Sequence, residues 1–207
     1  MTTTTTPRSP ARRRFLATSS AMGGGLMLGF HVPMAQSQGA TPEINVWVLI
    51  QPDETVVVRI ARSEMGQGTL TGLAQLVAEE LQCDWARVTT EYPTPGQNLA
   101  RQRAWGNFST GGSRGVRESH DYVRKGGATA RMMLVQAAAD SWGVPPAQCQ
   151  AEKGVITHAA SGRRTTYGAV AAAAARLTPP TDVPLKDPKT WTIAGQPVLR
   201  LDTVAKT

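Results

Sequence analysis

Hydrophobic and polar positions follow a regular order in the first half of the chain. The stretches 44–50 (INVWVLI) and 55–62 (TVVVRIAR) are rich in β-branched residues and are separated by QPDE, so we predict two strands joined as a hairpin. Apolar residues then recur every three or four positions. This spacing predicts a helix over 69–82, with Glu79 and Glu80 on its solvent side.

The middle of the chain contains a long polar stretch between two regular patterns. RVTTEY (87–92) predicts a third strand. The stretch 93–115 has no periodicity, and loops of that length are usually functional or disordered. A second helix is predicted over 116–141, in which the pair Gly126-Gly127 either weakens the helix or allows close packing.

The remaining patterns complete an α+β fold, with a mixed small sheet and packed helices. The stretch 154–168 predicts two strands around a turn, and AVAAAAARL after it predicts a helix of small residues. From 179 onwards prolines are frequent and periodicity is lost. We therefore expect a leader over 1–40, one ligand-binding domain over 41–178 and an extended linker over 179–207.

The first 40 residues indicate an export signal. Arg12 and Arg13 precede a Phe-Leu pair, and a weakly apolar, glycine-rich run follows, which is the order of a twin-arginine signal. Small residues allow cleavage after Ala35 or Ala40. We expect a periplasmic protein, peripheral at the inner membrane through its partners. The alternative is a disordered basic tail beside an accidental apolar patch.

The net charge of +7 first suggests a nucleic-acid partner. Four of the 22 basic residues lie in the first 35 residues, which contain no acid, and the net charge without them is only +3. The basic excess therefore belongs mostly to the N-terminus, and we expect no nucleic-acid binding. The four residues are Arg8, Arg12, Arg13 and Arg14.

Cysteines and histidines give no metal-ligand pattern. Cys83 and Cys149 are far apart in the sequence, and we interpret both as small buried side chains, although a disulfide between them stays open. His31, His120 and His158 are scattered. We predict no metal bound directly by residues of this chain.

Two glycine-rich loops carry the candidate chemistry. EMGQG (64–68) lies between a predicted strand and a helix, and STGGSRG (109–115) leads into the long helix. Glycines let backbone N–H groups approach a ligand, and a helix N-terminus favours negative charge. These features suit an anionic ligand such as a phosphorylated cofactor. The alternative is that the glycines only make turns and that Ser113 or Thr69 caps a helix.

These loops resemble a known family. RIARSEMGQGTLTGLAQLVAEEL and the later GNFSTGGSRGVRESHDYV are similar to molybdopterin-binding subunits of the xanthine dehydrogenase family. More narrowly, the chain resembles isoquinoline 1-oxidoreductase beta subunits and the large subunits of membrane-bound aldehyde dehydrogenases. The resemblance extends over about 42–207. It is specific because ExGQG, AEEL and SxGGSRG follow a twin-arginine leader in that order.

The resemblance implies that both loops line a molybdenum cofactor, molybdopterin cytosine dinucleotide. It places Gln67 near the molybdenum or the pterin, and the serine–glycine loop around the phosphates or the pterin. The cofactor-binding residues that it implies are Gly66, Gln67, Gly68, Ser109, Thr110, Gly111, Gly112, Ser113 and Arg114.

The family's chemistry is hydroxylation, in which water supplies oxygen to the carbon of an aldehyde or an N-heterocycle. Electrons pass to a small [2Fe-2S] subunit and, in exported complexes, to a membrane-bound cytochrome c subunit. Family subunits are several times longer than this chain, and their catalytic glutamate lies in a distant C-terminal part. We therefore assign no catalytic residue here, and Glu64 is expected to belong to the loop.

We favour the N-terminal part of a molybdenum hydroxylase large subunit, which shares its cofactor with the remainder of that subunit and is inactive alone. One alternative is an exported, non-catalytic module that binds anions or nucleotides. Another is a non-functional truncated fragment. The side chains that choose between aldehyde and N-heterocycle are expected to lie largely outside this chain.

Overall fold

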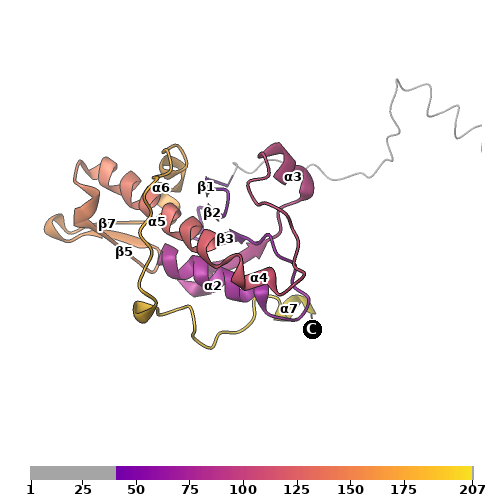
Figure 1. The fold of residues 1–207 in the computed structure, drawn as a ribbon. Coiled ribbons are helices and arrows are strands. Elements are labelled where there is room, and N and C mark those ends of the chain that lie inside the picture. Colours follow the sequence, from indigo (N-terminus) through magenta and orange to yellow (C-terminus); the bar gives the residue numbers. More distant parts are fainter. Residues whose placement is uncertain (1–40, 207) are drawn as a thin grey trace, which may run out of the picture. The chain divides into compact units, whose positions relative to one another are not determined.

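The β-branched runs of the first half form a four-stranded sheet. The computed structural model describes residues 41–206, so the leader expected over 1–40 lies outside the described residues. β2 and β3 form the predicted antiparallel hairpin, whereas β4 joins β3 in parallel. The strands follow the spatial order β1 (Glu43–Asn45), β2 (Val48–Ile50), β3 (Val56–Arg59) and β4 (Val88–Glu91) (Figure 1).

The single strand predicted over 44–50 is in fact two strands. The chain reverses at 46–47, and β1 pairs antiparallel with β2. Asn45 stabilises this turn, because its Oδ1 accepts hydrogen bonds from the backbone nitrogens of Trp47 (2.9 Å) and Val48 (3.1 Å). An asparagine that bonds to the backbone two residues later favours a turn. The surrounding β-branched run concealed this local signal.

Two helices, α2 (Thr69–Leu81) and α5 (His120–Trp142), pack against each other at the centre of the fold (Figure 1). The glycine pair of α5 allows close packing on both sides, with Gly127 against α2 and Gly126 against the turn between β1 and β2. A Cβ on Gly127 would lie 2.5 Å from the carbonyl oxygen of Val77, and one on Gly126 would lie 2.8 Å from the Trp47 ring. Only glycine therefore permits so close an approach without a shift.

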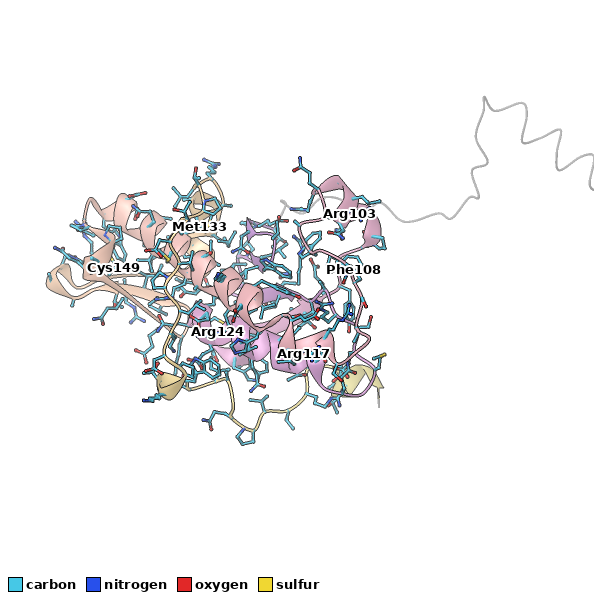
Figure 2. The ribbon with its side chains drawn as sticks, viewed as in Figure 1. Arg103, Phe108, Arg117, Arg124, Met133 and Cys149 are labelled. Atoms are coloured by element: carbon cyan, nitrogen blue, oxygen red, sulfur yellow. The ribbon has the colours of Figure 1, made fainter. Side chains whose placement is uncertain are left out.

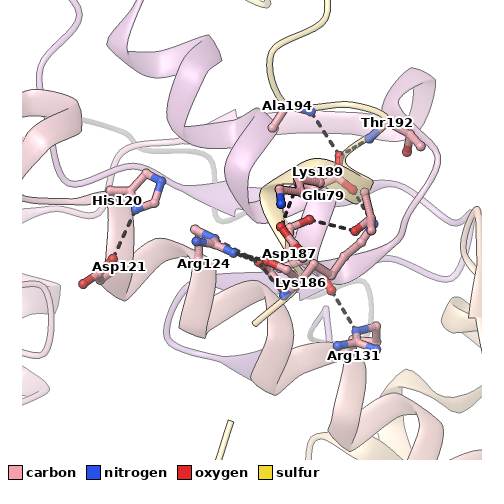
Figure 3. A network of polar contacts seen from close by, with 12 residues as sticks. Glu79, His120, Asp121, Arg124, Arg131, Lys186, Asp187, Lys189, Thr192 and Ala194 are labelled. Atoms are coloured by element: carbon pink, nitrogen blue, oxygen red, sulfur yellow. Dashed lines mark hydrogen bonds and ion pairs between the residues drawn. The ribbon is translucent and has the colours of Figure 1, made fainter. Parts of the chain in front are cut away.

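The prediction that Glu79 and Glu80 face solvent is wrong, since their exposed fractions are 1% and 0%. The Glu80 carboxylate accepts from Nε (2.9 Å) and Nη2 (2.7 Å) of Arg124. Glu79 accepts from Nζ of Lys186 and from the backbone N–H groups of 192–194 (Figure 3). A buried carboxylate is tolerated when it is paired and hydrogen-bonded, and here the partners come from distant segments.

A second, antiparallel sheet contains β5 (Cys149–Glu152), β6 (Val155–His158) and β7 (Arg163–Thr166), and α6 (Tyr167–Ala174) follows it. The sequence predicted β6, β7 and α6. It did not predict β5, because the sequence CQAE contains no β-branched residue. The hydroxyl of Tyr167 donates to the carbonyl oxygen of Leu81 (2.6 Å), so α6 is tied to the C-terminal end of α2.

The stretch 93–115 is less irregular than expected. It contains α3 (Pro95–Ala100), which Thr94 and Gln97 cap reciprocally. α4 (Arg114–Arg117) follows at its end, so α5 begins at His120 rather than at 116. Short 3-10 helices and the last helix complete the described chain: η1 (Trp85–Arg87), η2 (Pro146–Gln148), η3 (Ala159–Ser161), η4 (Pro188–Thr190) and α7 (Thr203–Lys206).

The C-terminal segment is irregular, as the sequence predicted, but it does not project freely from the domain. We call residues 191–202 the strap; it runs along α2 towards α7 (Figure 1). Within residues 41–206, no helix combines the length and apolar character that a membrane span requires. Residues 41–206 thus form an α+β domain, and the strap belongs to its packed structure.

Candidate functional site

The carboxylate of Glu64 shapes the first glycine loop. Its Oε1 accepts from the backbone nitrogens of Gly66 (2.7 Å) and Gly68 (3.0 Å), and its Oε2 accepts from that of Leu70 (3.0 Å). The side chain is only 3% exposed. Gly66 and Gly68 have φ angles of 106° and 82°, which side-chain-bearing residues rarely adopt. The two glycines therefore allow the loop to wrap around the carboxylate.

The environment of Glu64 suits a structural anion rather than a general base. Burial raises its pKa, but the three N–H donors and the Arg200 guanidinium lower it by more, so the pKa lies below its ordinary value. The carboxylate is ionised at neutral pH and both oxygens are engaged. The carboxylate also accepts from N–H groups at the start of α2, namely those of Gly68 and Leu70. These N–H groups are therefore not available to bind a phosphate.

Gln67 closes the loop from its other side. Its Oε1 accepts from the backbone nitrogen of Met65 (2.6 Å), and its Nε2 donates to the carbonyl oxygen of Ser63 (2.8 Å). The residue itself is exposed. The Gln67 amide is thus held at the surface of the loop in a fixed orientation.

The buried Arg62 holds the second loop. Its Nη1 donates to the carbonyl oxygen of Ser109, and its Nε donates to Oγ of Ser119 (3.0 Å). Gly112 and Ser113 then turn the chain with φ angles of 67° and 56°. Arg62 follows β3 after Ile60 and Ala61, so the segment that leaves the first sheet positions the serine–glycine loop.

The structure brings the two predicted loops together. Oγ1 of Thr110 accepts from the backbone nitrogen of Ser63 (2.9 Å). A few residues later, a Cβ on Gly115 would lie 2.8 Å from Oγ1 of Thr69, so the start of α4 packs directly on the start of α2. Segments almost 50 residues apart in the sequence therefore form one surface.

The alternative role of Ser113 and Thr69 as helix caps is not supported. Ser113 occupies the N-cap of α4 but makes no side-chain capping bond. At α2 the N-cap is Gly68, and Thr69 is already the first helical residue. The glycine loops therefore lead into α2 and α4 without side-chain caps, and the starts of these two helices lie next to each other.

This surface is accessible. Most of the predicted site residues are exposed, whereas Gly68 and Thr110 are partly buried. A hollow of about 170 Å³, lined by Arg62, Ser63 and Phe108 among others, lies at the base of the loops. Figure 2 shows Phe108 and Arg117 on this side of the molecule.

A larger groove of about 1390 Å³ lies elsewhere, and none of the predicted site residues lines it. Cys83 and Cys149 both line this groove and are free thiols. Burial raises the pKa of Cys83 to about 12, so this thiol is unreactive at neutral pH. Among residues 41–206, no group of three or more His, Cys, Asp or Glu side chains is arranged to hold a metal ion.

A family profile described as the molybdopterin cofactor-binding domain matches residues 5–202. The chain belongs to this family. This molybdopterin-binding domain is of the kind found in molybdenum hydroxylase-type oxidoreductases, as its sequence resemblance predicted.

Curated relatives extend well beyond the length of this chain. The domain is 38% identical over 170 residues to isoquinoline 1-oxidoreductase subunit beta of Brevundimonas diminuta, covering 78% of this chain and 22% of that protein. It is 33% identical over 175 residues to the membrane-bound aldehyde dehydrogenase [pyrroloquinoline-quinone] of Gluconacetobacter polyoxogenes, covering 79% and 21%. The chain therefore spans about a fifth of the length of these relatives.

Among solved structures, reconstituted CO dehydrogenase from Oligotropha carboxidovorans matches with a TM-score of 0.44 and 20% identity. The match covers 61% of this chain and 15% of that one.

The loop glycines of this molybdopterin-binding domain leave their backbone accessible. A Cβ at Gly66, Gly68 or Gly111 would meet no atom within 4 Å, so the space over these glycines is open. Arg114 is exposed beside them, although its Nε also lies 3.4 Å from Glu118. Open glycine backbone with hydroxyl, amide and guanidinium groups at its edge suits a polyanionic pterin cofactor.

Sequence reasoning missed two residues that shape the site. Arg62 lies in a strand-like run, and Arg200 lies in a segment interpreted as a linker. Neither position has a local sequence signal for its role, because each acts through contacts with residues far away in the chain.

Proposed function

We propose that this chain is the N-terminal part of a molybdenum hydroxylase large subunit and holds molybdopterin cytosine dinucleotide with its two glycine loops. The observation that carries this proposal is the meeting of the loops at the Ser63–Thr110 hydrogen bond. This bond joins the segment that leads into residues 66–68 to the loop that contains residues 109–114, which supports a shared binding surface. Membership of the molybdopterin-binding family supports the same ligand class.

In this proposal the residues of the chain bind and orient the cofactor. The loop glycines let the ligand approach the backbone, Gln67 presents its amide, and Arg114 balances phosphate charge. When bound, the cofactor supplies the oxidation, with water as the oxygen source, of an aldehyde or an N-heterocycle. No residue of this chain is assigned an acid–base role, and the domain alone is proposed to be inactive.

The partners we propose are the remainder of the large subunit, a small [2Fe-2S] subunit and a membrane-bound cytochrome c subunit. The names of relatives as subunits support an assembly of several chains. The periplasm is the proposed location, because residues 1–40 carry the order of a twin-arginine signal.

The test measures bound molybdenum and CMP in two samples. The first is the chain purified alone, and the second is the chain co-expressed with the remainder of the large subunit and the small iron–sulfur subunit. We expect to find bound molybdenum and bound CMP only in the second sample. Bound pyrroloquinoline quinone is measured as well, since the name of one relative includes it. If neither molybdenum nor CMP is found in either sample, a non-catalytic module or a non-functional fragment is favoured.

Replacing Gln67 by alanine tests the site itself. The substitution removes two hydrogen bonds that fix the loop, together with the amide that we propose contacts the cofactor. In the co-expressed complex we expect bound molybdenum and turnover to fall severalfold while the melting temperature stays near that of the parent. Gln150→Ala, at an exposed position of β5, is the matched control. Unchanged molybdenum content and turnover in Gln67→Ala would remove Gln67 from the site.

A further inference from the structure

A stripe of polar side chains on α2 holds the strap. Glu79 accepts from the backbone nitrogens of Thr192 (2.8 Å) and Ile193 (2.6 Å). Nε2 of Gln75 donates to the carbonyl oxygen of Ile193 (2.9 Å), and Oγ1 of Thr71 accepts from the backbone nitrogen of Leu201 (3.1 Å). Positions 79, 75 and 71 are spaced by four and share one helix face.

The strap therefore runs antiparallel to α2 and ends beside the first glycine loop. It contacts α2 first near its C-terminal end and then one turn at a time towards its N-terminal end. The side chain that reaches beyond α2 is Arg200. Its Nη1 donates to the carbonyl oxygen of Gly66 (3.0 Å), and its Nη2 donates to Oε1 of Glu64 (3.0 Å).

Arg200 acts on the atoms that shape the first loop. The oxygen of Glu64 to which it donates is the same one that accepts from the backbone of Gly66 and Gly68. Asp202 orients the guanidinium, since its carboxylate accepts from Nε (3.0 Å) and Nη2 (2.9 Å) of Arg200. A planar guanidinium donates in fixed directions, so a fork held in this way restrains both partners.

We propose that Arg200 is a positioning residue for the molybdopterin loop, and that strap docking sets the conformation of residues 64–68 through Glu64. This inference rests on the proposed function, in which that loop contacts the cofactor. Strap docking and cofactor binding then stabilise the same loop conformation, so each favours the other.

Hydrogen exchange of the whole chain without cofactor tests the positioning step. In Arg200→Gln we expect the backbone amides of Gly66, Gly68 and Leu70 to exchange severalfold faster than in the parent. The amides of Thr192 and Ile193, held by Glu79, should keep their protection. If the whole strap loosened, these amides and those of the 64–70 loop would both exchange faster. Arg176→Gln, at an exposed position after α6, is the matched control.

Arg200→Lys keeps the charge but loses the fork, and we expect an intermediate exchange rate. It also serves as the test variant if Arg200→Gln does not fold, as judged by circular dichroism. If exchange over 64–70 in the folded variants equals that of the parent, Arg200 does not position the loop, whatever the loop binds.

The second measurement is molybdenum retained by the co-expressed complex after dialysis, where we expect a severalfold loss in Arg200→Gln. Faster exchange with reduced molybdenum supports the inference. If exchange accelerates but the retained molybdenum equals that of the parent, the loop is positioned by Arg200 yet does not hold the cofactor. That outcome overturns the proposed cofactor site, whereas the positioning of the loop by Arg200 stands.

Discussion

At the scale of single residues, the glycines of this domain have opposite roles even within one pair of helices. Gly127 on α5 lies against the backbone of α2, where a Cβ would be 2.5 Å from the carbonyl oxygen of Val77. Gly72 lies within α2, and a Cβ there would meet no atom within 4 Å. The first glycine is required by packing, whereas the second only lowers helix propensity.

Alanine substitutions at these two positions should therefore change stability in opposite directions. Gly127→Ala forces two helix backbones apart and is expected to lower the free energy of unfolding by about 1–3 kcal/mol. Gly72→Ala increases helix propensity and should raise the free energy of unfolding by roughly 0.5–1 kcal/mol. Urea unfolding of both variants measures the difference. Equal effects would show that Gly127 is not a packing contact.

At the scale of elements, periodicity predicted those parts of the fold whose signal is local. The helix over 69–82 and the hairpin of β2 and β3 follow from spacing and β-branching alone. The burial of Glu79 and Glu80 does not, because the groups that compensate their charge are Arg124 of α5, Lys186 and the strap backbone, all far away in the sequence. Sequence patterns predict which face of a helix is apolar. They do not predict which distant residues will form hydrogen bonds with a buried carboxylate.

The candidate site shows the same division. The glycine loops were visible as motifs, and the resemblance predicted the ligand class of the domain. The contact between them through Thr110, and the role of Glu64 as the internal anion of the first loop, required coordinates. Arg200 was missed because a linker with prolines offers no sign that it folds back.

The anchoring of the strap predicts a dependence on pH. Burial raises the pKa of Glu79, but Lys186 and the strap N–H groups lower it by more, so the folded pKa lies below the ordinary value of 4.5. Its contribution to stability is therefore complete above about pH 4.5 and is lost as pH falls through the folded pKa.

Glu79→Gln removes this acid-sensitive contribution and leaves Lys186 without its buried partner. We expect the free energy of unfolding at pH 7 to fall by about 3–5 kcal/mol. The further loss between pH 5 and pH 3 should be smaller than in the parent. Denaturant unfolding at these pH values, with exposed Glu152→Gln as control, measures both. A variant with the parent's loss of stability in acid would contradict the assignment.

At the scale of the described domain, the two sheets depend on a common centre. The second sheet and α6 are joined to α2 by the buried hydroxyl of Tyr167, which donates to the carbonyl oxygen of Leu81. The first sheet reaches the same helix from its other end through the Glu64 loop. α2 is therefore hydrogen-bonded at one end to the start of α6 and at the other end to the loop that follows the first sheet.

Removing the Tyr167 hydroxyl tests this connection. Tyr167→Phe keeps the ring in the core and leaves the Leu81 carbonyl without this donor, at an expected cost of about 1–3 kcal/mol. Thermal unfolding measures the loss. Thr157→Val, which removes an exposed hydroxyl on β6, should change stability little. Comparable losses in both variants would mean that the buried bond contributes nothing specific.

The anchoring of Glu79 by the strap also determines when this part of the domain can fold during synthesis. Glu79 is synthesised more than 100 residues before the groups that donate to its carboxylate, which are Nζ of Lys186 and the backbone N–H groups of 192–194. Until those residues leave the exit tunnel, α2 carries an acid that cannot be buried without cost. The strap contacts of Glu79 and the contacts of Arg200 with the first glycine loop can therefore form only after residues 192–200 have left the tunnel.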